Sequence, residues 1–133
     1  ASDVGGGTSL SMLTTMAEAY KVCRLRGQPL TPWQAFYLAT LGNARALHQD
    51  QQTGSFQPGR HADFVVLDPS GTPQLAMKRQ YGRTPFETLF NLMILGDDRA
   101  ITATIVAGEI RYQAVGATIS PSSLKPTHFT LGA

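Results

Sequence analysis

Two segments of this sequence carry the same helix-start signal, and they fix where two helices must begin. Thr31-Pro32-Trp33-Gln34 and Thr84-Pro85-Phe86-Glu87 each place a threonine before a proline and a Gln or Glu two residues after that proline. The threonine side chain can accept a hydrogen bond from the third helical N–H, while the Gln or Glu side chain reaches back to the threonine N–H. Proline at the first helical position already has a helical φ. The sequence therefore predicts one helix that begins at Pro32 and is interrupted at Gly42, and another over 84–96.

Another helix is predicted before these two. Apolar residues recur at helical spacing over 10–23, Thr8 or Ser9 can cap the start, and Gly27 ends the pattern. Residues 43–47 predict a short helical piece after the interruption in the second helix.

The remaining chain predicts β structure and loops. The nearly continuous apolar run at 62–68 predicts a strand buried on both faces. Residues 101–113 predict a hairpin that turns at Ala107-Gly108. Segment 70–83 is polar and broken by Gly and Pro, which predicts a loop, and residues 114–133 predict an irregular tail.

This order of elements predicts an α+β fold with helices and a small β-sheet or hairpin. Three strands cannot close a barrel, and a sheet of that size needs another element to pack on. We therefore expect the chain to be the end of a larger protein.

Composition agrees with such a role but also permits another. Of the 133 residues, 15% are charged, against about 25% in an average soluble domain. Either part of this surface is covered by another domain or chain, or the protein is well buried and simply carries few charges.

Charge and hydropathy exclude several classes of partner. The net charge is +2, and Lys and Arg are dispersed along the chain, which argues against binding to nucleic acid or to an anionic membrane. No apolar stretch approaches the roughly 20 residues that span a bilayer. Cys23 is the single cysteine, which excludes an internal disulfide and a multi-cysteine zinc site. We expect a cytoplasmic protein.

The opening segment, ASDVGGGTSL, places Asp3 just before the three glycines at positions 5–7. Consecutive glycines cost backbone entropy on folding. They indicate a sharp turn or a close approach of the backbone to a ligand, and they make Asp3 the candidate functional carboxylate.

Four segments together resemble the guanine deaminases of the amidohydrolase superfamily. The opening Ser2–Ser9 is similar to the segment after the eighth barrel strand in that family, and residues 30–47 are similar to the superfamily's helix pair. The stretch 54–68 is similar to the superfamily pattern G-x-φ-x-P-G-K-x-A-D-φ-φ-φ-φ-D, where φ is apolar. The segment Leu95–Arg99, with Val106-Ala107-Gly108 after it, is typical of the guanine deaminase branch.

This resemblance implies a (β/α)8 barrel flanked by a small β-sandwich, with zinc at the C-terminal mouth of the barrel. Residues 1–49 would be the end of the barrel, residues 50–113 part of the sandwich with helix 84–96 inserted, and 114–133 a tail. Asp3 matches the family's aspartate ligand, which accepts the proton of the metal-bound water. The reaction implied is guanine plus water to xanthine plus ammonia.

The chain departs from the family in one respect that matters for activity. It contains no H-x-H pair, and its three histidines, His48, His61 and His128, do not match the family's metal ligands. A lone aspartate does not make a zinc site, which needs three or four protein ligands. We therefore expect a C-terminal fragment without the barrel, inactive and metal-free by itself, with zinc and guanine bound only by the complete enzyme.

Two alternatives remain open. The chain could be a non-catalytic module that associates with itself, because a fragment without its barrel exposes apolar faces, and we expect a homo-oligomer. It could also derive from another heterocycle aminohydrolase.

Two further acidic segments have a structural interpretation. Asp97-Asp98-Arg99 follows a helix end, where such residues form a turn with local ion pairs. Asp63 precedes an apolar strand, where we expect its carboxylate to accept a backbone hydrogen bond.

Overall fold

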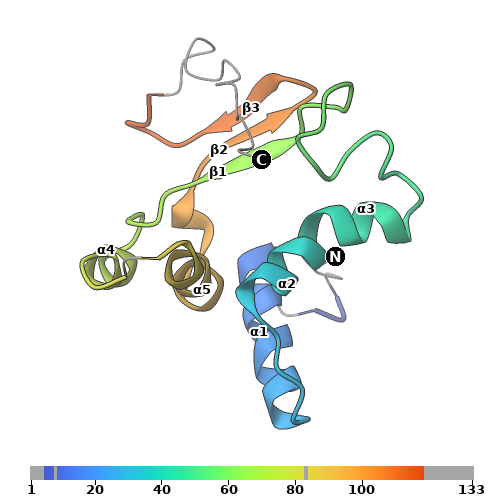
Figure 1. Ribbon diagram of the computed structural model, residues 1–133. Helices are drawn as coiled ribbons and strands as arrows, with labels where there is room; N and C mark the ends of the chain where they lie inside the picture. Colours follow the sequence, from blue (N-terminus) through green and yellow to red (C-terminus); the bar gives the residue numbers. More distant parts are fainter. Residues whose placement is uncertain (1–4, 8, 83, 119–133) are drawn as a thin grey trace, which may run out of the picture.

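The computed structural model describes residues 5–7, 9–82 and 84–118. Figure 1 shows a three-stranded sheet on one side of the molecule and the helices on the other. The helices are α1 (Met12–Leu25), α2 (Pro32–Tyr37), α3 (Asn43–Ala46), α4 (Pro73–Arg79) and α5 (Pro85–Leu95); η1 (Leu38–Gly42) is a π-helical turn and η2 (Asp98–Ala100) a 3-10 turn. The strands are β1 (Phe64–Leu67), β2 (Ile101–Val106) and β3 (Glu109–Gln113). The prediction of helices combined with a small sheet is confirmed.

Helix α5 is the centre of the helical layer. It packs against α1, α2 and α4, and Figure 1 shows α4 and α5 end-on and side by side. One core joins these helices to the η2 turn, and its buried members are Leu13, Met16, Ala35, Leu75, Leu92, Met93 and Ala100. Tyr20 of α1 and Phe90 of α5 add an edge-to-face ring contact with centroids 5.5 Å apart. The helices that flank the β1 strand in sequence thus share one core.

The capping signals formed as the sequence predicted. Both Thr31 with Gln34 and Thr84 with Glu87 make the reciprocal pair of hydrogen bonds, with proline at the start of each helix. The start of α1 is different from the prediction: its cap is Ser11, which accepts a hydrogen bond from the N–H of Thr14 at 3.4 Å. Ser9 is therefore not the cap, and Thr8 lies outside the described residues.

The sequence predicted a loop over 70–83. The structure contradicts this prediction in part, because the segment contains helix α4. Helix α4 begins after Thr72, whose side chain accepts a hydrogen bond from the N–H of Leu75. Leu75 is 1% exposed, and its burial in the shared core holds this short helix in place. Thr72-Pro73 repeats the threonine-proline start, but without a Gln or Glu to complete the pair.

Gly42 does not interrupt the second helix. Its φ of −61° is helical, and the chain passes from α2 through the π-helical turn η1 into α3 without leaving helical geometry. A side chain at Gly42 would meet the backbone oxygen and ring of Tyr37 at 3.0–3.1 Å. The absence of a side chain at Gly42 therefore allows the ring of Tyr37 to pack this closely against the helix.

The sheet is antiparallel with the order β1-β2-β3, and the predicted hairpin is β2–β3. β1 is an edge strand and not a strand buried on both faces, because Val65 is 51% exposed while Phe64 pairs with buried Ile105 of β2. Within the described parts of the chain, no helix is long and apolar enough to cross a membrane.

Candidate functional site

The candidate site begins at the glycine-rich opening of the chain. Asp3, the predicted metal ligand and catalytic carboxylate, lies outside the described residues. Gly5 has a φ of +115°, a conformation that glycine adopts and L side chains rarely do. Gly5, Gly6 and Gly7 are all exposed. The positive φ agrees with the sharp turn that the consecutive glycines predicted.

Helix α1 follows this opening directly, and its first turn is anchored by polar and apolar contacts. The N–H of Ser11 donates to the side chain of Ser9 at 3.0 Å, and the Ser11 oxygen accepts from the N–H of Thr15 at 3.0 Å. Leu13, in the same turn, is only 5% exposed. The site segment therefore leads into a helix start with a fixed place in the core.

The segment Leu95–Arg99 lies against this helix start. The glycine at its centre, Gly96, approaches Leu13 so closely that a side chain carbon there would lie 2.9 Å from Leu13 Cδ1 and 2.3 Å from the backbone oxygen of Leu92. The segment Leu95–Arg99 thus contacts the helix that follows the glycine-rich opening. Sequence reasoning missed this contact, because the sequence pattern indicates Gly96 only as the end of a helix and its tertiary neighbour has no local signal.

Asp97 and Arg99 make the local ion pair that the sequence predicted. The guanidinium donates Nε and Nη2 to the carboxylate at 3.1 and 2.6 Å, and the Arg99 N–H donates to it at 3.0 Å. The Arg99 hydrogen bonds lower the pKa of the Asp97 carboxyl below its usual value, against a smaller opposing effect of burial. The same pair raises the pKa of Arg99.

The histidines are the other candidate metal ligands in the sequence. His48 and His61 are both exposed, and His128 lies outside the described residues. Over residues 5–7, 9–82 and 84–118, no group of three or more His, Cys, Asp or Glu side chains could hold a metal ion. These residues do not by themselves fit a zinc site, so a metal bound near Asp3 would need ligands from elsewhere.

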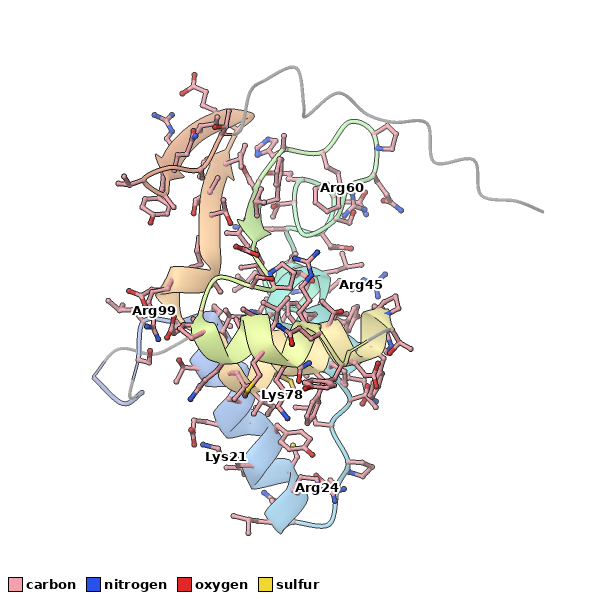
Figure 2. The ribbon with its side chains drawn as sticks, turned by 90° about the vertical axis from the view of Figure 1, so that its left-hand side faces the viewer. Lys21, Arg24, Arg45, Arg60, Lys78 and Arg99 are labelled. Carbon is pink, nitrogen blue, oxygen red and sulfur yellow. The ribbon has the colours of Figure 1, made fainter. Side chains whose placement is uncertain are left out.

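Two of the surface hollows among the described helices are large enough to consider as sites. One, of about 150 Å³, lies between α1 and α2 and is lined mainly by apolar side chains, among them Met16, Ala35 and Leu38. The other, of about 220 Å³, lies between the end of α4 and the start of α5, where Lys78, Tyr81 and Phe90 line it. Figure 2 shows Lys78 on the outer side of this helix pair. Glu87 also lines this second hollow, but its carboxylate accepts the N–H and hydroxyl hydrogen bonds of Thr84 in the helix cap.

The comparisons with known proteins agree with this placement of motifs. Residues 1–111 match the Amidohydrolase family. Over 111 residues the chain is 46% identical to the guanine deaminase of Escherichia coli (strain K12), which covers 84% of this chain and 25% of that protein. The chain thus spans about a quarter of the length of this curated relative.

Solved structures give the same result. A structure of E. coli guanine deaminase superposes with a TM-score of 0.83 at 45% identity, covering 85% of this chain and 26% of that one. A guanine deaminase from Bradyrhizobium japonicum gives 0.76 at 33% identity, covering 84% and 30%.

A more distant structure widens the comparison beyond guanine deaminases. An adenosine deaminase from Xanthomonas campestris, solved with bound zinc, gives a TM-score of 0.61 at 25% identity and covers 77% of this chain and 22% of that one. The Amidohydrolase family match extends over most of the chain. The resemblance to amidohydrolases and guanine deaminases that the sequence suggested is therefore confirmed. This chain belongs to the amidohydrolase family.

Proposed function

We propose that this chain is the C-terminal part of a guanine deaminase, which converts guanine and water to xanthine and ammonia. The observation that carries the proposal is the likeness of this chain to E. coli guanine deaminase, at 46% identity over 111 residues in sequence and a TM-score of 0.83 in structure. The adenosine deaminase of X. campestris is less similar by both measures, which favours guanine over another heterocycle.

The proposed division of the chain follows from this origin. Residues 1–49 close the barrel, residues 50–113 belong to the flanking β-sandwich, and 114–133 form a tail. Helices α1 to α3 fall in the first part and all described strands in the second, which supports the division. Helix α5, in the second part, packs on α1 and α2, so the two parts would move as one unit in the enzyme.

Asp3 is the residue to which we assign a place in the reaction. In the complete enzyme it would supply one carboxylate ligand to zinc, and the remaining ligands would come from the part of the protein that resembles the other three quarters of its relatives. The bound zinc of the X. campestris structure supports this choice of metal. This chain's own contribution is then to carry Asp3 on the glycine-rich turn and to hold that turn at the start of α1.

The apolar surface of the chain is consistent with coverage by the rest of an enzyme. Leu25, Phe56 and Tyr81 are 87%, 84% and 75% exposed, and the rest of a larger enzyme could cover them. The non-catalytic alternative, a self-associating module, would bury the same residues between copies. Sedimentation of the 133-residue chain tests self-association, which requires a mass that rises with protein concentration, whereas the enzyme origin is tested by the chimera below.

A chimera tests the function. The 111-residue segment of E. coli guanine deaminase that aligns with this chain is replaced by residues 1–111, and xanthine formation from guanine is measured with zinc supplied. We expect turnover of guanine, loss of that turnover in the chimera with Asp3→Asn, and no turnover of adenosine. A chimera that folds and deaminates adenosine in preference to guanine would overturn the substrate.

The isolated chain is the companion measurement. We expect it to release no ammonia from guanine, because the resemblance assigns the metal-binding histidines to a part of the enzyme that this sequence does not contain. Release above the buffer rate that disappears in Asp3→Asn would contradict the fragment hypothesis.

A further inference from the structure

The turn at Gly96–Arg99 is packed against the first turn of α1 with almost no free space. Gly96 ends α5, and its N–H donates to the backbone oxygen of Leu92 at 2.9 Å. Any side chain at Gly96 would overlap that oxygen and Leu13 Cδ1. Because Leu13 is 5% exposed, it has no free volume into which it could retreat.

The far side of the Gly96–Arg99 turn is braced as well. Ala100, directly after it, is fully buried in the same core as Leu13. The Ala100 oxygen accepts a hydrogen bond from the N–H of Asp68 at 2.8 Å. Gly71 approaches so closely that a side chain carbon there would lie 2.8 Å from the backbone oxygen of Arg99. The loop after β1 therefore holds the turn against α1.

The Asp97 carboxylate fixes the shape of the turn itself. It accepts three hydrogen bonds from Arg99, from the backbone N–H, Nε and Nη2, and the Asp97 backbone oxygen accepts from the N–H of Ala100 at 3.1 Å. Figure 2 shows Arg99 at the outer edge of the molecule, so the guanidinium closes the turn from the solvent side. Asp98, between the two, is exposed, and its effect on Arg99 is the weakest of the interactions that raise the Arg99 pKa.

We propose that the Gly96–Arg99 turn is a positioning element: it fixes the first turn of α1 and, through that turn, the glycine-rich segment that carries Asp3. Helix α1 begins at Met12, nine residues after Asp3, so a displaced helix start displaces the point from which the segment leaves. The effect on Asp3 rests on the proposed function, whereas the effect on α1 does not.

Amide hydrogen exchange in the 133-residue chain tests the effect on α1. Wild type is compared with Asp97→Ala, which removes the acceptor of all three Arg99 hydrogen bonds, and with Asp98→Ala as the matched control in the same turn. We expect the Asp97→Ala variant to exchange about three- to tenfold faster at the amides of Thr15, Met16 and Ala17. Exchange at Ala103 and Ile105 in the sheet should not change, and Asp98→Ala should match wild type throughout.

Two results would overturn the proposal at this level. Uniformly faster exchange across α1 and the sheet would mean that Asp97 contributes only to global stability. Unchanged exchange at residues 15–17 would mean that the turn does not hold α1. Gly96→Ala should displace the first turn of α1 more than Asp97→Ala does, because its side chain would overlap Leu92 and Leu13. If Gly96→Ala does not fold, the comparison of Asp97→Ala with wild type still tests the proposal.

The chimera described above tests the effect on Asp3. Asp97→Ala in the chimera should weaken zinc affinity and lower kcat about three- to tenfold, with KM for guanine unchanged because no purine-contacting group is altered. An inactive wild-type chimera would defeat the proposed function and leave the exchange result standing. An active chimera whose zinc affinity and kcat do not respond to Asp97→Ala would defeat the positioning role alone.

Discussion

The carboxylate of Asp63 accepts a hydrogen bond from the backbone N–H of Ala107 at 2.7 Å, across 44 residues of sequence. Its second oxygen accepts from the hydroxyl of Thr53 at 3.3 Å. One side chain at the start of β1 therefore joins the loop before the strand to the turn of the β2–β3 hairpin. The sequence predicted that the Asp63 carboxylate accepts a backbone hydrogen bond. The structure confirms this, and the donor is the N–H of Ala107 in the turn of the β2–β3 hairpin.

Removing this carboxylate should loosen the hairpin turn. Hydrogen bonds to charged groups contribute about 1.5–3 kcal/mol when shielded from water, and Asp63 is exposed, so we expect Asp63→Ala to lower the free energy of unfolding by about 1 kcal/mol. Asp63→Asn keeps an oxygen acceptor and should lose less than half of that. Urea unfolding measures both, and equal losses in the two variants would show that the charge, not the hydrogen bond, is responsible.

The same turn contains a residue with an unfavourable backbone conformation. Ala107 has a φ of +53° and Gly108 a φ of +81°, the pattern of a type I′ turn, for which Asn-Gly is the preferred sequence. Ala107→Asn should therefore stabilise the chain by about 0.5–1 kcal/mol, while the N–H that Asp63 accepts is kept. Ala107→Val is the opposing control, because a β-branched side chain resists positive φ. A thermal midpoint that falls in Ala107→Asn would contradict this reading of the turn.

The third threonine-proline helix start shows what the sequence could and could not predict. At Thr31 and Thr84 the reciprocal Gln or Glu made the helix recognisable. At Thr72 the corresponding residue is Leu75, whose contribution is burial, and burial depends on α5 and α1, which are distant in sequence. Local signals therefore located α2 and α5, whereas α4 follows from tertiary packing.

The same division holds for the sheet and the candidate site. The apolar run of β1 predicted a strand, but which of its faces is covered depends on neighbouring strands, and the exposed Val65 shows that one face is open. The glycines at 5–7 predicted a sharp turn or a close approach to a ligand, and the positive φ of Gly5 agrees with a turn. The packing of Gly96 on Leu13 joins segments about 80 residues apart, and no local pattern announces a contact of that kind.

Helix capping at Thr72 should be more costly to lose than at the other two starts. Thr72 is 4% exposed, so Thr72→Ala leaves the N–H of Leu75 without an acceptor in a place that water does not reach. We expect a loss of about 1–2 kcal/mol in the free energy of unfolding. Thr31→Ala, at an exposed cap, should lose about 0.5–1 kcal/mol.

Serine at position 72 is the control for this comparison. Thr72→Ser keeps the hydroxyl acceptor and should recover most of the loss seen in Thr72→Ala. If Thr72→Ala and Thr31→Ala lower the free energy of unfolding equally, then burial does not increase the stability that the capping hydrogen bond contributes.

The Asp97–Arg99 pair should make a small part of the stability depend on acid pH. Arg99 lowers the pKa of Asp97 below the usual 3.8, so the ionised carboxylate is favoured in the folded chain. The contribution is fully present above that usual value and is lost as the pH falls through the lowered pKa of the folded state. Because solvent screens this pair, with the Arg99 side chain 65% and the Asp97 side chain 37% exposed, its contribution is small. Unfolding in urea, followed from neutral pH to below 3.8, should therefore show the difference between wild type and Asp97→Ala shrinking with acidification. A difference that stays constant across this range would mean that the charge of Asp97 contributes nothing and that its side chain acts independently of ionisation.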